Sequence, residues 1–259
     1  MEQRTAHADA RLPAIAGLLW TLLNMLQFAF TLLWTAGCIS LALLVQAVTG
    51  RRDIALRMAA WLWAPGLMVF TGGRFEVEGD DAIDWSRPYL VVANHESVID
   101  ICALFRAVPV PMRFLLKEEM HRVPFVGRYA RATGMLFITR DDRRSGPLLR
   151  RQAAALLAEG RTLCLFPEGT RSRDGTLGNF KAGSLQAAID AGVQILPVAL
   201  HGTGAVLPAE GFFRVRPGPI RASVGRPLDV RDADGAAIPR QALAEQAQAQ
   251  VVSMLGRMR

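Results

Sequence analysis

The sequence predicts an α/β protein with a mixed, largely parallel sheet flanked by helices and an N-terminal membrane-anchoring helical segment. Two observations lead to this prediction. A long uncharged run occupies the N-terminal part of the chain, and beyond it short apolar runs alternate with helical patterns and with glycine and proline. A chain of 259 residues suffices for one full-sized domain and an appendage. We therefore expect membrane-anchoring helices over residues 1–72 and one α/β domain over residues 73–259.

The N-terminal segment is too long and too apolar for an ordinary core helix. Residues 12–50 contain no charged side chain, and as a helix they would extend roughly 58 Å, beyond the roughly 30 Å hydrocarbon core of a bilayer. Three arginines between residues 51 and 57, followed by Trp61 and Trp63, predict that the chain leaves the membrane on its cytoplasmic side. The segment either crosses the bilayer or lies half-inserted as a bent helix pair, with Gly37 as the candidate bend.

The remaining chain predicts alternating strands and helices. Each strand is expected where a short apolar run lies between turn-forming residues, and each helix where apolar residues recur with a helical period. The expected strands are Tyr89–Ala93, Met112–Leu116, Met135–Thr139, Thr162–Phe166, Gln194–Leu200 and Ile220–Val224. The expected helices are Val98–Ala107, Phe125–Thr133, Pro147–Glu159, Ser184–Ala191 and Arg240–Leu255.

The composition limits the classes of partner. The net charge of +7 suits anionic lipid headgroups, phosphorylated substrates or nucleic acid, but a hydrophobic content of 51% argues against nucleic acid. Only Lys117 and Lys181 are lysines among the 30 basic residues, which points mildly to sites that need a compact ammonium group. The three cysteines are far apart and lie in apolar runs, so they predict neither a disulfide framework nor a metal cluster.

A histidine motif directly follows the first predicted buried strand. Asn94 and His95 lie at its carboxyl end, where open α/β sheets place their ligands. His95 and Asp100 can meet only if the histidine precedes the next helix, and Ser97 is the expected N-cap of that helix. The carboxylate would then orient the imidazole and stabilise its protonated form, leaving the other nitrogen as a general base.

Other interpretations of this motif stay open. Asp100 could cap the helix while His95 is an ordinary loop histidine, and the motif alone favours neither interpretation. A metal site formed by His95, Glu96 and Asp100 lacks further ligands at a recognisable spacing, so no metal is predicted. Cys164 is a poor candidate nucleophile because it lies in mid-strand without a basic partner.

A second polar turn follows the strand that ends at Phe166. In Pro167-Glu168-Gly169-Thr170-Arg171 the proline and glycine predict a tight turn at a strand end. An arginine there suits bidentate contact with phosphate, and a carboxylate suits a hydroxyl group. Taken alone, this motif is better explained as a surface turn with a solvated ion pair.

The two motifs together resemble the glycerolipid acyltransferase family, and within it the bacterial 1-acyl-glycerol-3-phosphate (lysophosphatidic acid) acyltransferases. His-x4-Asp precedes Phe-Pro-Glu-Gly-Thr-Arg-Ser by some seventy residues. Two further stretches resemble the family's second and fourth motifs: Lys117 to Met120 with Phe137 to Arg140, and Leu196 to Ala199. The similarity covers roughly residues 85–205 in the family's order.

The resemblance implies an acyltransferase domain over residues 73–259, with His95 and Asp100 as catalytic residues. It implies that the glycerophosphate is bound by Lys117, Arg140, Glu168, Gly169, Thr170 and Arg171, with Asn94, Ser97 and Lys181 as further candidates. The acceptor would be 1-acylglycerol 3-phosphate and the donor acyl-CoA or acyl carrier protein, without any cofactor. The expected partners are these substrates and the lipid bilayer, and the expected location is the inner (cytoplasmic) membrane, with the catalytic domain facing the cytoplasm.

Three alternatives remain at the level of the sequence. The same chemistry could serve another acceptor, such as a lyso-ornithine lipid or another lysophospholipid. A metal-dependent phosphoesterase on the membrane surface would instead release phosphate or fatty acid and would be sensitive to chelators. A non-catalytic lipid-binding anchor would explain neither the histidine motif nor the arginine turn.

Overall fold

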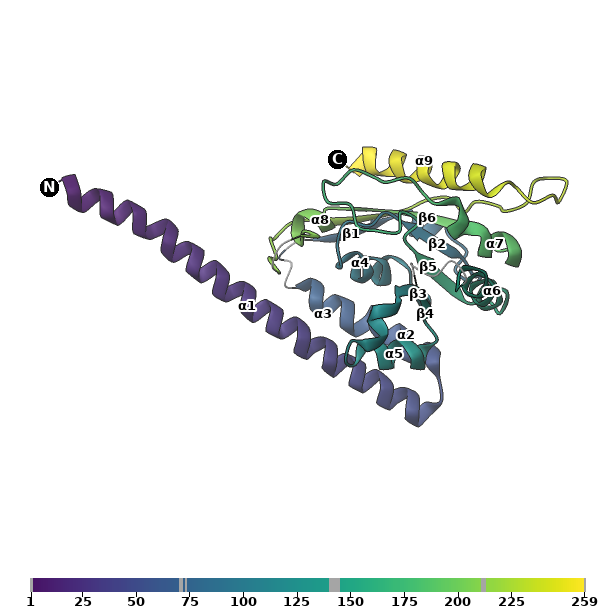
Figure 1. Ribbon diagram of the computed structural model, residues 1–259, viewed down its shortest axis with the longest axis horizontal. Helices are drawn as coiled ribbons and strands as arrows, with labels where there is room; N and C mark the ends of the chain where they lie inside the picture. The colour runs from purple at the N-terminus through teal and green to yellow at the C-terminus, as the bar shows by residue number, and fades with distance from the viewer. Residues whose placement is uncertain (1, 70–71, 73, 140–144, 211–212, 259) are drawn as a thin grey trace.

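The computed structural model of the chain describes residues 2–69, 72, 74–139, 145–210 and 213–258 (Figure 1). The α-helices are α1 (Glu2–Thr49), α2 (Arg52–Met58), α3 (Ala64–Val69), α4 (Asp100–Ala107), α5 (Val126–Thr133), α6 (Ser145–Ala158), α7 (Gln186–Ala191), α8 (Thr203–Val206) and α9 (Arg240–Met258). A π-helical stretch, Ala59–Trp63, joins α2 to α3, and 3-10 turns cover Asp80–Ala82, Glu118–Arg122 and Ala182–Leu185. The strands are β1 (Phe75–Glu78), β2 (Leu90–Ala93), β3 (Met112–Lys117), β4 (Leu136–Ile138), β5 (Thr162–Leu165), β6 (Ile195–His201) and β7 (Ile220–Val224).

The strands form one seven-stranded sheet in the order β1-β7-β6-β2-β5-β3-β4. Five neighbouring strands, β6 to β4 in this order, run parallel to one another. Strand β7 pairs antiparallel with β6, and β1 joins the edge parallel to β7. The predicted mixed, largely parallel sheet is therefore confirmed.

Helices cover both faces of this sheet, and alternate residues of each central strand supply the two cores. On β2, Val91 and Ala93 face the core shared with α3 and α4, whereas Leu90 and Val92 face the core under α6, α7 and α9. All four residues are fully buried. This burial on both sides explains why β2 is a continuous apolar run rather than an alternating one. Figure 1 shows α9 and α4 on opposite sides of the sheet.

The N-terminal helices form a hairpin in which α2 and α3 fold back along α1 (Figure 1). The bend considered at Gly37 is wrong, since α1 is continuous to Thr49 and the chain turns at Gly50, whose φ is 68°. The arms are joined by the Trp63 indole, which donates to Thr35 Oγ1 at 3.0 Å. Within α1, residues 16–49 are long and apolar enough to span a membrane, and few of them are buried. This exposed apolar surface supports membrane association.

Every predicted strand and helix of the α/β domain corresponds to one in the structure, with shifts of one to three residues at most ends. The helix expected over residues 184–191 begins as the 3-10 turn and continues as α7. Strand β1 and the short helix α8 were not predicted. Strand β1 alternates Phe75 and Val77 with exposed glutamates at the sheet edge, so it lacks the apolar run by which the buried strands were found.

Candidate active site

The sheet order brings the separate polar motifs to one edge. The histidine motif follows β2, the arginine turn follows β5, and Lys117 ends β3. These three strands are adjacent and parallel, so their carboxyl ends lie side by side. Strand β4, after which Arg140 comes, is the next parallel strand in the sheet. Residues up to seventy positions apart in the chain therefore meet at one edge.

His95 and Asp100 form a close pair at this edge. The His95 Nδ1 atom lies 2.7 Å from Asp100 Oδ2, with the carboxylate side chain fully buried and 18% of the histidine side chain exposed. The same carboxylate oxygen accepts the backbone N–H groups of Glu96 and Ser97 at 2.8 Å each. Three donors thus hold one oxygen in place, and an Nδ1–H bond to Asp100 leaves His95 Nε2 as the nitrogen available for base catalysis.

The carboxylate reaches back from the start of the next helix as expected, but the expected N-cap is wrong. Helix α4 begins at Asp100 itself and is preceded by Ile99, which makes no side-chain cap. The Ser97 hydroxyl instead accepts the Ile99 N–H and donates to the Leu207 carbonyl at 2.6 Å. Ser97 therefore anchors the loop to the segment that follows α8.

Asn94 joins two strands and faces the sheet rather than the substrate side. Its buried amide donates to the Leu200 carbonyl at 2.9 Å and accepts the Leu200 N–H at 2.8 Å. These two bonds connect the end of β2 to β6. The amide nitrogen and the amide oxygen of Asn94 are thus both bonded to the main chain of β6. This geometry supports a positioning role for Asn94 rather than contact with a ligand.

The turn after β5 holds the main chain of His95 from the other side. The Glu168 carboxylate accepts the His95 N–H at 2.8 Å, and the His95 carbonyl accepts the Ser172 N–H at 2.7 Å. The Phe166 ring stacks on the imidazole with 3.8 Å between ring centroids and 9° between the planes. Neither Ser172 nor Phe166 was identified as a site residue from the sequence. Only their membership of the motif from Phe166 to Ser172 signalled them.

Glu168 is a buried acceptor. Its second oxygen takes the Gly178 N–H at 2.7 Å, so both oxygens are used by main-chain donors. Burial raises the pKa of this carboxyl group, and the two N–H bonds act in the opposite direction. A carboxylate occupied in this way holds the turn against the histidine loop. Its predicted contact with a substrate hydroxyl remains untested.

Basic side chains surround the same edge. Arg171, Thr170 and Lys117 are exposed, and within the described part of the chain Arg171 and Lys117 have no ion-pair partner. The ammonium of Lys181 lies 2.6 Å from the point that a Gly169 Cβ would occupy. The turn favours glycine for its conformation, with Gly169 at φ 77°.

Arg140 lies outside the described residues, although the strand that leads to it is in place. Cys164 is fully buried in β5, and burial raises the pKa of its thiol. A buried neutral thiol does not suit the nucleophile considered for it. The described residues contain no group of three His, Cys, Asp or Glu side chains placed to hold a metal ion.

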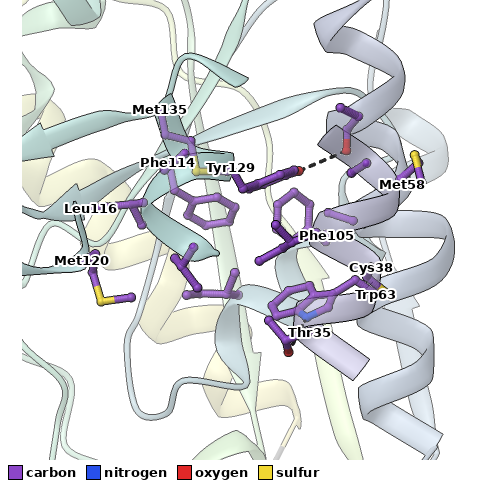
Figure 2. Close-up of a pocket in the computed structure, with 17 residues that line it drawn as sticks. Thr35, Cys38, Met58, Trp63, Phe105, Phe114, Leu116, Met120, Tyr129 and Met135 are labelled. Atoms are coloured by element: carbon purple, nitrogen blue, oxygen red, sulfur yellow. Dashed lines mark hydrogen bonds between the residues drawn. The ribbon is translucent and has the colours of Figure 1, made fainter. Parts of the chain in front are cut away.

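An apolar cavity of about 180 Å³ lies between the N-terminal hairpin and the sheet (Figure 2). Its walls come from α1, α2, α4, β3 and α5, and none of the lining side chains is charged. Ile101, the residue after Asp100, and Phe105 contribute from α4, and the Tyr129 hydroxyl donates to the Ala55 carbonyl at 3.0 Å across one wall. The cavity therefore borders the helix that begins with Asp100, and its apolar lining can take a hydrocarbon chain.

Residues 74–201 match the family model described as Acyltransferase. A 1-acyl-sn-glycerol-3-phosphate acyltransferase of Chlamydomonas reinhardtii is 34% identical over 224 residues, covering 85% of this chain and 64% of the relative. One of Borreliella burgdorferi is 32% identical over 142 residues, covering 55% of this chain and 54% of the relative. The chain thus spans about half to two thirds of the length of these relatives.

A solved structure agrees over nearly the whole chain. The crystal structure of the 1-acyl-sn-glycerophosphate (LPA) acyltransferase PlsC from Thermotoga maritima superposes with a TM-score of 0.79 at 26% identity, covering 93% of this chain and 97% of that one. The family resemblance of the four motifs is confirmed, and residues 74–201 of this chain are a domain of the Acyltransferase family.

Proposed function

We propose that the protein transfers a fatty acyl chain to the sn-2 hydroxyl of 1-acylglycerol 3-phosphate and so produces phosphatidic acid for phospholipid synthesis. The observation that carries this proposal is the 2.7 Å contact between His95 and Asp100 at the carboxyl edge of β2, beside the basic turn after β5. The names of the similar proteins support the choice of acceptor.

His95 acts as the general base. Its Nε2 takes the proton of the acceptor hydroxyl while that oxygen attacks the thioester carbonyl carbon. The C–S bond then breaks, and the proton passes from the imidazolium to the departing thiolate. Asp100 stabilises the imidazolium between the two proton transfers. The acyl group moves directly to the acceptor, without an acyl-enzyme intermediate.

Arg171, Lys117 and Arg140 bind the acceptor phosphate, with Lys181 beside Gly169 as a further cation. These residues come from the ends of adjacent strands, so the phosphate would sit beside the imidazole. Arg171 is exposed and has no ion-pair partner among the described residues, so its guanidinium suits ligand binding better than a structural role.

The donor is a long-chain acyl thioester, either acyl-CoA or an acylated carrier protein, and no cofactor takes part. The apolar cavity under α1 would hold the donor's hydrocarbon chain. With α1 in the inner membrane and the arginines after Gly50 on its cytoplasmic side, the catalytic domain would meet the soluble donor in the cytoplasm and the acceptor in the leaflet.

The proposal is tested with the full-length protein, labelled acyl-CoA and a panel of acceptors that includes lysophosphatidate, a neutral monoacylglycerol and lyso-ornithine lipid. We expect labelled phosphatidic acid from wild type and a loss of order 10²-fold or more for His95→Ala. Transfer to lyso-ornithine lipid in preference to lysophosphatidate would assign the other acceptor. An active His95→Ala variant would contradict the assignment of His95 as the general base.

Arg171 and Arg173 form a matched pair for the phosphate contact. Both are exposed, but Arg173 Nε is paired with Glu210 Oε1 at 2.9 Å, whereas Arg171 is free within the described residues. Arg171→Ala should raise the KM for lysophosphatidate about tenfold or more, because a charge-assisted bond to phosphate is lost. Arg173→Ala should leave it within about twofold. Equal effects of the two substitutions would contradict the assignment.

A further inference from the structure

Two adjoining polar cavities lie at the opposite edge of the sheet from His95, near the amino ends of β2, β3 and β5. Their volumes are about 330 Å³ and 180 Å³, and both are lined by Asp53, Arg113 and Arg161. The larger is also lined by Gly50, Arg51, Arg52, Gly134, Leu156 and Glu159, and the smaller by Arg57, Trp85, Ser86, Arg87, Val110, Pro111, Gly160 and Thr162. Six arginines thus face two acidic residues.

Arg113 is the central residue of this site, because it is buried and charged without a counter-ion. Only 5% of the residue is exposed, and its Nε donates to the Thr133 carbonyl at 3.2 Å. Within the described residues no carboxylate lies within 4 Å of it. Burial lowers the pKa of Arg113, and the positive charges of Arg161 and Arg52 lower it further. A buried guanidinium among like charges is costly unless an anion compensates it.

The neighbouring acids compensate that charge only in part. Asp53 is already paired with Arg51 at 2.8 Å. The negative charge of Glu159 raises the pKa of Arg113, but within the described residues Glu159 forms no ion pair with it. The Arg113 Nε and an Arg52 terminal nitrogen lie 3.5 Å and 4.0 Å from the point that a Gly134 Cβ would occupy. Two guanidinium groups therefore converge over Gly134, with a third arginine on the same cavity wall.

Hydrogen bonds join the helices that border the larger cavity. The Gln46 side chain, near the end of α1, donates to the Ala132 carbonyl at 2.8 Å. The Tyr129 hydroxyl joins α5 to Ala55 on α2. The cavity thus lies directly under the turn where the apolar segment 16–49 ends and the chain becomes basic, the level at which lipid headgroups meet a membrane-associated helix.

We infer that this arginine-lined cavity is a second anion site, separate from the catalytic edge, that binds a phosphate group, with the headgroup of an anionic phospholipid as its source. Guanidinium groups match the two oxygens of a phosphate in bidentate geometry. A headgroup bound there would compensate Arg113 and hold the α1–α2 turn at the membrane surface. The acceptor of the acyl transfer binds at the other edge, so this site serves attachment and orientation.

The test compares ligand-induced shifts in the thermal midpoint of full-length protein in detergent. The ligands are short-chain phosphatidylglycerol, short-chain phosphatidylcholine and inorganic phosphate. We expect a saturable stabilisation by phosphatidylglycerol and little by phosphatidylcholine, whose headgroup carries no net charge. The double variant Arg52→Gln/Arg161→Gln, which changes two exposed residues, should weaken the apparent affinity about tenfold or more. Arg113→Gln should do the same if it folds.

Arg226→Gln/Arg240→Gln is the matched control, because both of these arginines are exposed and line neither cavity. It should keep the wild-type response. Inorganic phosphate could give a saturable stabilisation that is lost in the Arg52/Arg161 variant, while phosphatidylglycerol gives none. That result would support the phosphate site and assign it to a soluble anion. Equal responses of the two double variants, or no saturable response of wild type to either phosphate compound, would overturn the inference.

Discussion

Asp100→Asn isolates the charge behind the catalytic histidine. The substitution keeps the size of the side chain, which is fully buried at the start of α4. In the wild type one carboxylate oxygen accepts His95 Nδ1–H at 2.7 Å and the N–H groups of Glu96 and Ser97 at 2.8 Å. An asparagine oxygen can still accept these bonds, so the loop should keep its shape. What disappears is the negative charge beside the imidazolium.

The expected loss follows from that contact. A charge-assisted hydrogen bond contributes about 1.5–3 kcal/mol, and two unit charges about 4 Å apart interact by about 4 kcal/mol near a protein surface. These are two estimates of one interaction and are not added. Because His95 becomes charged only as the hydroxyl proton is transferred, the loss falls on the transition state. We expect kcat to fall about 10- to 10³-fold with little change in the KM for either substrate.

The assay is initial-rate formation of phosphatidic acid from labelled acyl-CoA and lysophosphatidate. Asp190→Asn is the control, since Asp190 is an exposed carboxylate paired with Arg150 at 3.1 Å on another helix, and its replacement should leave kcat within about twofold. Circular dichroism and the thermal midpoint establish that both variants are folded. A folded Asp100→Asn enzyme with kcat within a few-fold of wild type would refute the general-base role of the pair.

Three further perturbations follow from the structure. Burial raises the pKa of Glu168 above 4.5. The free energy of unfolding of the wild type, relative to that of Glu168→Gln, should therefore be largest below about pH 4.5 and should fall as the pH rises. Urea unfolding measures this difference. A Cβ on Gly66 would collide with the Trp34 ring, whereas Gly37 has open space. Unfolding should therefore show Gly66→Ala less stable by about 1–3 kcal/mol and Gly37→Ala unharmed. Ala130→Leu fills part of the apolar cavity and should raise the KM of long-chain donors about fiftyfold relative to short-chain ones, because the added carbons displace about three methylenes at about 0.8 kcal/mol each.

The buried strands could be predicted from the sequence because burial on both faces imposes an apolar run with turn formers at its ends. Strand β1 could not, because Glu76 and Glu78 face solvent at the sheet edge. The helix bend was assigned to Gly37, whereas the turn lies at Gly50, where the backbone adopts a left-handed conformation. A glycine within a long apolar helix is compatible with a straight helix, so the residue type alone does not locate a bend.

For the site, the His95 and Asp100 contact was one of two interpretations that the spacing left open, and the resemblance to the acyltransferase family favoured it. The partners of Glu168 and Asn94 could not be predicted. Glu168 accepts main-chain N–H groups of residues 95 and 178, and Asn94 bonds the main chain of β6. Any residue can supply such a main-chain partner, so the sequence carries no sign of it. The arginine-lined cavity was missed for a related reason, since its members come from five separate stretches of the chain, 50–57, 85–87, 110–113, 134 and 156–162.

The two main-chain bonds of His95 have a consequence for biosynthesis. Its N–H and carbonyl are held by Glu168 and Ser172, which the ribosome adds more than seventy residues after the histidine. A nascent chain whose first helix has already entered the bilayer therefore carries the base and its carboxylate without the turn that fixes them. Catalysis must wait until β5 has emerged and docked beside β2. If the proposed function holds, the order of the chain thus separates the entry of the first helix into the membrane from the completion of the site for acyl transfer.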